Sequence, residues 1–388
     1  MAETNPILMI SADCHAGPKQ EAYRQYLAKD VREEYDLWVA EAIEQRARRK
    51  SLFEGKFLEK HMAGAPTGEG FSGAWDPEQR VRQLEDDGTV AEVIYPDSIV
   101  AGGVPFGAGI SMKSKEIDPR LTLAGARAHN RWLKDLCDAH PGRRAGVAII
   151  PIDDIDTALS EIAWARNAFN PGGVMLPAGV GELPLYFDPR YEPIWAACAD
   201  LGLPVSFHTG SGPPEYGQFS FSPMLYVSES PWFAHRPLTF LMWSGVFERH
   251  PNLTVVMAEQ GSAWIIHTLK AWDGQYANPM LKHLVADLSL KPSEYFARQI
   301  FIAASMLSPQ ECSVRHKIGV DKLMWGSDYP HPEGTWPHTK KRIHETFGDV
   351  PEDEVRAMLG ETAAKVYGFD TDALAEHARR VGPLPNEI

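Results

Sequence analysis

Eight short apolar runs, separated by longer amphipathic stretches, constrain the fold of this 388-residue chain more than any other feature. Gly, Pro or charged residues bound each run, which is the pattern of a buried strand rather than of a helix. The predicted strands are Ile7–Ser11, Ala91–Tyr95, Ala145–Ile150, Gly173–Leu176, Val205–Phe207, Thr254–Ala258, Ile300–Ala303 and Lys322–Trp325.

Amphipathic helical patterns lie between most of these runs. They cover Pro77–Asp87, Arg120–Ala139, Ile155–Ala168, Pro189–Leu201, Leu238–Arg249, Ala263–Gln275 and Ser308–Ile318. Strands that alternate with helices form parallel sheets, and eight such repeats close on themselves. We therefore predict an α/β fold, a (β/α)8 TIM barrel, with the whole chain (1–388) as a single domain.

Two connections are too long for ordinary barrel loops. The first, at about 17–76 after strand one, contains the charged helical pattern Glu41–Lys50, and the second, at about 209–237 after strand five, carries Gly, Pro and aromatic residues. Because both follow strands, we expect them to distort the barrel and to cover its mouth as cap or lid elements. Contact between subunits is the alternative use for them.

The composition excludes several classes of partner. The formal net charge of −14 argues against nucleic acid and anionic membrane, which both require a basic surface. We expect neither a signal peptide nor a membrane span, because residues 1–13 show no basic leader and no stretch is apolar over enough residues. The four cysteines are scattered without a CxxC pair, which fits free thiols in the cytoplasm.

Ligand-type side chains follow four of the eight predicted strands. A single Asp or His at such a place is more often a helix cap or a loop hydrogen-bonder, but four strand ends of this kind are hard to obtain by capping alone. The carboxyl ends of barrel strands meet at the catalytic face, so the set predicts a metal site there. The candidate ligands are Asp13, His15, His208, Glu259, Asp328 and His331.

Five segments carry a resemblance to a known family. They are Ser11–His15, Phe207–Gly210, Arg249–Leu253, Gly326–His331 and the C-terminal Leu359–Gly368. In this order and spacing the chain resembles the amidohydrolase superfamily, in the branch named for aminocarboxymuconate semialdehyde decarboxylase. The resemblance implies a divalent metal bound by the strand-one motif, the strand-five His and the strand-eight Asp. In this sequence those residues are Asp13, His15, His208 and Asp328.

The chain departs from that pattern at two positions. The strand-one motif is Asp13-x-His15, an acid-x-His variant of the usual His-x-His, and Glu259 stands where decarboxylases of the branch often have a His. We therefore hypothesise one or two metal ions per chain, with Glu259 as a bridge and His331 as a further nitrogen ligand. The mixed nitrogen and oxygen donors suit Zn, Fe or Mn.

This departure makes metal-dependent hydrolysis the preferred interpretation. Metal-activated water would attack a small-molecule amide, ester, thioester or related bond, with Asp328, Glu259 and His331 as catalytic residues. The alternatives are non-oxidative decarboxylation of a small carboxylic acid, a dinuclear iron or manganese oxygenase, and a catalytically silent structural subunit. Each uses the same fold.

Partners and two further residues complete the expectations. We predict a homo-oligomer, with a dimer as the default from symmetry, and a hetero-oligomer with a paralogue as the alternative. His235 lies in the predicted lid, where it could contact substrate. Strand alternation points Cys14 away from Asp13 and His15, so we interpret this thiol as a packing residue.

Overall fold

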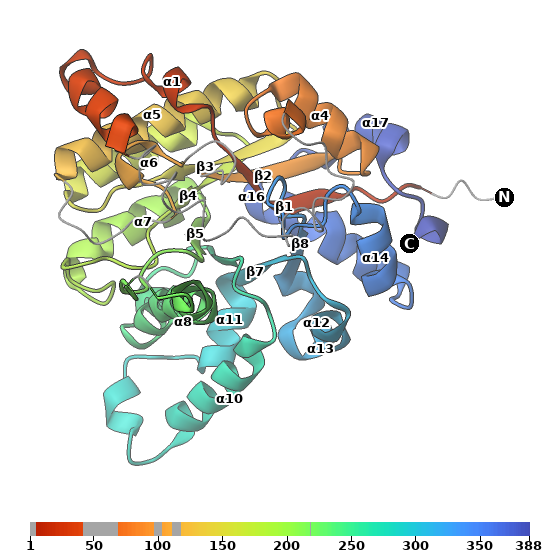
Figure 1. The fold of residues 1–388 in the computed structure, drawn as a ribbon. Helices are drawn as coiled ribbons and strands as arrows, with labels where there is room; N and C mark the ends of the chain where they lie inside the picture. Colours follow the sequence, from red (N-terminus) through yellow and green to blue (C-terminus); the bar gives the residue numbers. More distant parts are fainter. Residues whose placement is uncertain (1–4, 42–68, 97–102, 111–117, 218) are drawn as a thin grey trace.

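The computed structural model describes residues 5–41, 69–96, 103–110, 118–217 and 219–388. Its centre is an eight-stranded sheet in which every neighbouring pair is parallel and the strands follow chain order (Figure 1). The strands are β1 Ile10–Ala16, β2 Ala91–Pro96, β3 Arg144–Ile149, β4 Gly172–Met175, β5 Val205–His208, β6 Val255–Ala258, β7 Ile300–Ser305 and β8 Leu323–Gly326. The predicted (β/α)8 barrel is confirmed.

The barrel closes irregularly between its first and last strands. The pairing that joins them is a single bridge between Cys14 and Tyr329, the latter lying beyond the end of β8. The backbone N–H of Asp328 donates to the carbonyl of Asp13 over 2.9 Å. Gly326 permits this approach, because a Cβ at that position would lie 2.7 Å from the Cβ of Asp13. The loop after β8 therefore completes the barrel, and the predicted distortion is confirmed.

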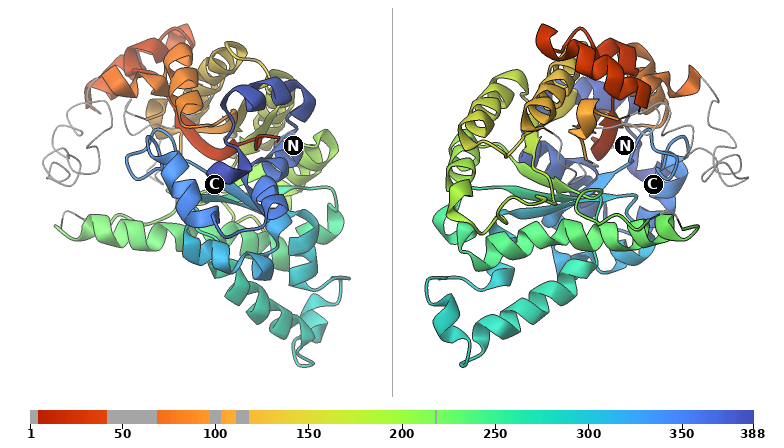
Figure 2. Two further views of the ribbon diagram at one scale, coloured as in Figure 1. Left: turned by 90° about the vertical axis from the view of Figure 1, so that its right-hand side faces the viewer. Right: turned by 60° about the vertical axis from the view of Figure 1, so that its left-hand side comes forward.

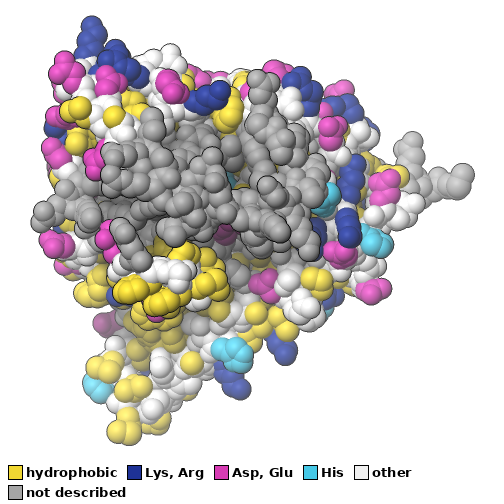
Figure 3. All heavy atoms as spheres, viewed as in Figure 1, with side chains coloured by type: hydrophobic (Ala, Val, Ile, Leu, Met, Phe, Trp, Pro, Cys, Tyr) yellow, Lys and Arg dark blue, Asp and Glu magenta, His cyan; other side chains and the backbone are white. Residues whose placement is uncertain are grey.

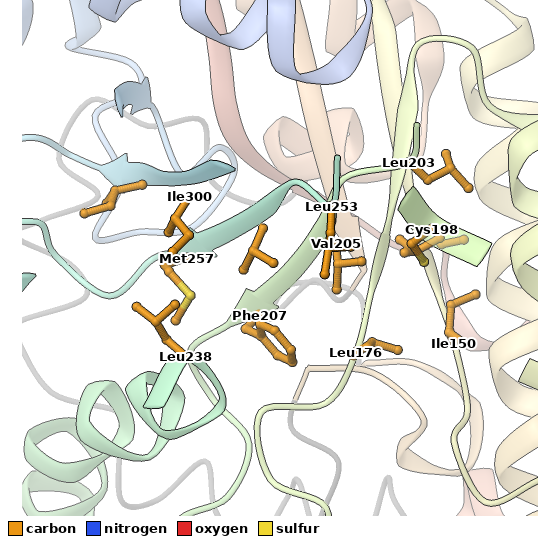
Figure 4. Close-up of a cluster of buried hydrophobic side chains, with 14 of the residues drawn as sticks. Ile150, Leu176, Cys198, Leu203, Val205, Phe207, Leu238, Leu253, Met257 and Ile300 are labelled. Atoms are coloured by element: carbon orange, nitrogen blue, oxygen red, sulfur yellow. The ribbon is translucent and has the colours of Figure 1, made fainter. Parts of the chain in front are cut away.

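Strand alternation divides the apolar core in two. In β6, Val256 and Ala258 point into the barrel, whereas Val255 and Met257 point outward to the helices. Figure 4 shows the outward set, in which Val205, Phe207 and Met257 gather with side chains such as Leu238 from the helical layer.

Helices surround the strands, and several begin at sequence signals that fix their start. Asp76 accepts hydrogen bonds of 2.9 Å from the N–H groups of Glu78 and Gln79, and Pro77 occupies the first helical position. The helices are α1 Gln20–Tyr23, α4 Pro77–Asp86, α5 Pro119–Asp138, α6 Ile155–Ala168, α7 Glu192–Leu201, α8 Ser222–Trp243, α9 Val246–Arg249, α10 Trp264–Ala277, α11 Pro292–Gln299, α12 Pro309–Ser313, α13 Arg315–Ile318, α14 Thr339–Phe347, α15 Glu352–Arg356, α16 Thr362–Tyr367 and α17 Thr371–Val381.

The described part of the first insertion packs against helix α5. Tyr23 lies 2.8 Å from Nδ1 of His129, and the hydroxyl of Tyr26 donates to Asp135 over 2.6 Å, so this part contacts α5. A helix covers residues 32–41, and residues 42–68, which include nearly all of the expected Glu41–Lys50 helix, lie outside the described residues. The expected cap over the mouth stays a prediction.

The second insertion differs from its predicted form. Residues 222–237, expected to be part of a loop, belong to the long helix α8, which continues through Pro231 and Pro237. A proline removes one backbone donor, and tertiary packing of the helix offsets that loss here. Within the described part of the chain, no helix combines the length and apolar character needed to cross a membrane.

Candidate active site

Three side chains from β1 and β5 converge inside the carboxyl end of the barrel. Nε2 of His15 lies 3.5 Å from Oδ1 of Asp13, and Nε2 of His208 lies 3.4 Å from the same oxygen. All three side chains are buried. Asp13 and His15 lie within β1, not just past its end as predicted, because the strand begins and ends later in the chain. Both still point to the site, as alternation predicts.

The loop after β8 adds Asp328 and His331. Oδ1 of Asp328 lies 3.3 Å from Nε2 of His15 and 3.0 Å from Nδ1 of His331. The rings of His15 and His331 stack, with centroids 4.1 Å apart. Burial acts to raise the pKa of Asp328, but the two imidazoles hold it well below its ordinary value. The carboxylate is therefore charged at neutral pH.

Glu259 stands directly after β6 and faces the same centre. Its Oε2 lies 3.4 Å from Nδ1 of His208, and its side chain is 19% exposed, whereas Asp13 and Asp328 are fully buried. Burial and the neighbouring charge of Asp328 raise its pKa well above the ordinary value. In the described part of the chain, the ion-pair partner of Glu259 is His208 and not an arginine.

Backbone strain collects at this end of the barrel. Among the described residues, four non-glycine residues have positive φ, and three of them lie within two residues of a strand end: Glu259 at 53°, Met306 at 54° and Asp328 at 59°. Such conformations cost roughly 1–3 kcal/mol each and persist where the surrounding structure imposes them. Two of the candidate carboxylates, those of Glu259 and Asp328, therefore stand on strained backbone.

The donor atoms fit a divalent cation. Buried nitrogen and oxygen atoms of Asp13, His15, His208 and Asp328 have no hydrogen-bond partner. Their separations of 3.3–3.5 Å match ligand atoms that each lie about 2.1 Å from one ion, since such atoms are themselves about 3.0–3.4 Å apart. Unpaired buried polar atoms are costly, so this set indicates a ligand that the protein is built to hold.

The six predicted residues fall into overlapping groups rather than one. Within each group the ligand atoms lie within 4.8 Å of one another. The groups are Asp13, His15, His208 and Glu259; His15, Asp328 and His331; and Glu259, Asp328, His331 and Glu333. Glu259 is shared by the first and last groups, which is the position that the bridging hypothesis requires. The number of ions stays a prediction.

The His208 ring is oriented by its backbone neighbour. Nδ1 lies 2.9 Å from the carbonyl oxygen of Thr209, so Nδ1 donates its proton there and Nε2 faces the cluster. Burial lowers the pKa of His208, but the charges of Asp13 and Glu259 outweigh this effect and raise it to about 9. Below that pH Nε2 also carries a proton, and a metal ion at Nε2 would have to displace it.

Two supporting residues were missed by the sequence reasoning. Ser305 donates its hydroxyl to Oδ2 of Asp13, which leaves Oδ1 directed at the two histidines. The predicted seventh strand ended at Ala303, and this two-residue error in the boundary hid a strand-end hydroxyl. Arg80 donates to the carbonyl of His15 over 2.9 Å, but its helix position gave no signal of that long-range contact.

Cys14 and His235 have contacts that bear on their predicted roles. Sγ of Cys14 lies 3.1 Å from Oγ of Ser11 and 3.4 Å from Oγ of Ser327, on the opposite side of β1 from the site, so it packs as predicted. His235 stacks on Trp264 with ring centroids 3.6 Å apart. A role for His235 in substrate contact stays a prediction.

The chain matches one family model. The family described as Amidohydrolase matches residues 114–369, which is more than half of the chain. The 2-amino-3-carboxymuconate-6-semialdehyde decarboxylase of Dictyostelium discoideum is 24% identical over 344 residues, covering 87% of this chain and 86% of that protein. The gamma-resorcylate decarboxylase of Rhizobium sp. is 26% identical over 235 residues, covering 55% of this chain and 68% of that protein.

Solved structures share the fold. The 5-carboxyvanillate decarboxylase of Sphingomonas paucimobilis superposes with a TM-score of 0.67 at 19% identity, covering 94% of this chain and 100% of that chain. The Novosphingobium aromaticivorans 5-carboxyvanillate decarboxylase, complexed with manganese, has a TM-score of 0.63 at 15% identity, covering 93% of this chain and 96% of that chain. The prediction of a divalent-metal cofactor agrees with the donor cluster and with the manganese in that relative.

The interpretation as a hydrolase is wrong. The sequence relatives and the named structural neighbours above are decarboxylases, which was the second interpretation. The error came from Glu259. We took the absence of a strand-six His as evidence against decarboxylation, whereas a carboxylate next to a metal centre is compatible with either chemistry.

Proposed function

Because the chain belongs to the amidohydrolase family, and its sequence relatives are decarboxylases, we propose that it is a metal-dependent, non-oxidative decarboxylase of a small carboxylic acid. The observation that carries the proposal is the convergence of unpaired buried donor atoms from Asp13, His15, His208 and Asp328 at the catalytic end of the barrel. An unsaturated or aromatic acid is the expected substrate class, because conjugation can accommodate the electron pair that departing CO2 leaves behind.

We assign the cation to Asp13, His15, His208 and Asp328, with Glu259 and His331 completing the donor groups. Bound there, a divalent ion would attract the carboxylate of the substrate and neutralise part of the local negative charge. The protein itself supplies the burial that excludes water and the backbone contact at Nδ1 of His208 that orients this ring.

The reaction requires one proton. The C–C bond to the carboxylate breaks, its electron pair stays on the substrate carbon, and CO2 departs; protonation of that carbon then gives R–H. We assign the proton to the carboxyl group of Glu259, because this side chain reaches the opening whereas Asp13 and Asp328 are fully buried. Asp328 keeps its charge and orients His331 through the 3.0 Å contact at Nδ1.

The test is turnover of a panel of small hydroxybenzoic and unsaturated acids by metal-loaded protein in D2O. CO2 release with one deuterium on the vacated carbon is the expected result. Glu259→Gln should reduce turnover while retaining metal binding, and Asp328→Asn should reduce both. Turnover of amides or esters without CO2 release would contradict the proposal.

Metal content, measured by mass spectrometry of the untagged protein, tests the number of ions separately. One ion per chain would leave Glu259 as an acid alone. Two ions per chain, falling to one in Glu259→Ala, would support the bridging hypothesis.

A further inference from the structure

Glu311 joins two loops at the catalytic end of the barrel. Its Oε1 accepts hydrogen bonds from the backbone N–H of Ser262 over 2.6 Å and from the Ser262 hydroxyl over 2.9 Å. Its Oε2 accepts from the N–H of Ser308 over 3.2 Å and from the Ser308 hydroxyl over 2.9 Å. Ser262 lies in the loop after β6 and Ser308 in the loop after β7, so one carboxylate connects the two loops.

A helix cap explains only half of this pattern. Ser308 and Glu311 form a capping box at the start of α12, and that role uses one carboxylate oxygen. The other oxygen reaches Ser262, a fully buried residue 49 positions away in the sequence. Acidic side chains are dispersed over the face of the molecule shown in Figure 3, as on any solvated surface, whereas both oxygens of Glu311 are bound within the protein. The second contact therefore requires another explanation.

The loop after β6 needs such a contact because its backbone is strained. Glu259 and Gly261 have positive φ, at 53° and 65°. For a glutamate this conformation persists only where neighbouring contacts impose it. The side-chain amide of Gln260 donates to the carbonyl of Phe207 over 2.7 Å, which fixes the loop to β5. Glu311 fixes the next part of the loop, one residue after Gly261.

The two loops stand next to each other because β6 and β7 pair in parallel. Figure 2 shows the strands at the centre of the molecule with helices outside, so α12 approaches the loop from the helical layer. Glu311 therefore holds the loop from behind. Glu259, three residues before Ser262, faces the candidate site, where its Oε2 lies 3.4 Å from Nδ1 of His208.

We propose that Glu311 is a positioning residue, which holds the loop after β6 so that the carboxyl group of Glu259 stays directed at the substrate. This inference rests on the proposed function, in which Glu259 supplies the proton. Glu311 acts through the loop and not on the reacting atoms. The four assigned metal ligands lie on β1, on β5 and after β8, so the effect of Glu311 on metal binding should be small.

The first test compares Glu311→Ala with Glu294→Ala. Glu294 occupies the equivalent position in α11, where it accepts from the N–H of Lys291 over 3.0 Å. Both variants lose a helix cap, so both should lower the melting temperature by similar amounts. Only Glu311→Ala should lower kcat, by about 10–100-fold, while the affinity for Mn²⁺ changes by less than about threefold. An equal loss of kcat in both variants, or a parallel loss of metal affinity, would contradict the proposal.

The second test asks whether Glu311 acts through Glu259. In the Glu259→Gln background, adding Glu311→Ala should change kcat by less than about twofold, because the group being positioned is already gone. Fully additive losses would mean that Glu311 acts elsewhere. Glu311→Gln should retain most of the turnover, since its amide oxygen can still accept from Ser262 and its NH2 group can donate to the Ser308 hydroxyl.

Hydrogen exchange separates this proposal from the proposed function. In the full chain with Mn²⁺, amides 259–262 should exchange at least about tenfold faster in Glu311→Ala, and at the wild-type rate in Glu294→Ala, as measured by mass spectrometry. An unchanged rate in Glu311→Ala would overturn the positioning role even in an active decarboxylase. Faster exchange in a protein that releases no CO2 would support the role of Glu311 in the loop and contradict the proposed function alone.

Discussion

Two buried charged clusters adjoin each other, and they differ in whether their polar atoms have hydrogen-bond partners. In the first, Arg80, Glu92 and Arg144 are paired: Nη2 of Arg80 lies 2.6 Å from Oε2 of Glu92, and Nη1 of Arg144 donates to a carbonyl over 2.6 Å. In the second, donor atoms around Asp13 and His15 are buried without hydrogen bonds.

The difference indicates that the first cluster stabilises the fold and that the second is built to hold a ligand. Burial acts to raise the pKa of Glu92, but Arg80 and Arg144 hold it below its ordinary value, so this cluster is complete within the protein. The second cluster is complete only with a ligand. The two are physically joined, since Arg80 also donates to the carbonyl of His15.

The largest expected effect comes from the incomplete cluster. Asp328→Asn keeps the shape of the side chain and removes its charge, so the proposed decarboxylation should fall roughly 10²–10⁴-fold. The melting temperature of the metal-free protein should fall by less than it does for a core substitution, because the variant loses the attraction between the carboxylate and the imidazoles of His15 and His331 but keeps the packing. A fall comparable to that of a core substitution would mean that Asp328 serves mainly to stabilise the fold.

Arg80→Met should have the opposite profile. It leaves Glu92 buried without its main partner, and breaking a buried pair in this way costs about 3–5 kcal/mol. Urea denaturation of the metal-free protein should detect the loss. Adding Glu92→Leu should recover much of it, and failure of that recovery would mean that the carbonyl contacts of Arg80 matter more than its ion pair.

Ser305→Ala tests whether the contact with Asp13 supports metal binding. Without the hydroxyl, Asp13 loses the donor that orients its carboxylate, and losses of this kind reduce metal affinity about 10–100-fold. Calorimetric titration with Mn²⁺ measures the effect, and Ser305→Thr should retain most of the affinity. Equal affinities for all three proteins would exclude an orienting role.

The smallest effect is the pH dependence of metal affinity. Since the pKa of His208 is raised to about 9 in the metal-free protein, its ring carries a proton at lower pH that the metal must displace. Affinity should therefore rise by up to about tenfold per pH unit and level off near pH 9.

The metal-free fold should show the opposite trend. The raised pKa of His208 contributes stability below its unfolded value of about 6.5, and that stability is lost as pH rises through about 9. Thermal unfolding at several pH values with and without Mn²⁺ measures both trends. A metal affinity that does not change between pH 6.5 and 8.5 would remove His208 from the ligand set.

The sequence by itself determined the barrel and the kinds of residue at its mouth. Apolar runs that alternate with amphipathic helices allow few other folds, and a ligand-type residue next to a strand's carboxyl end can lie only at one face. That logic predicted Asp13, His208 and Asp328 at one face without any knowledge of distances, and the structure brings their side chains together there.

Only the tertiary structure decided how those residues are held. The contacts of Ser305 with Asp13 and of Arg80 with His15 join segments far apart in the chain, and local patterns carry no information about such pairs. Periodicity also failed in α8, where packing of one helical face maintains the helix through two prolines. Strand order follows from short-range pattern, whereas orientation and pairing of buried polar groups depend on which distant segments the closed barrel brings together.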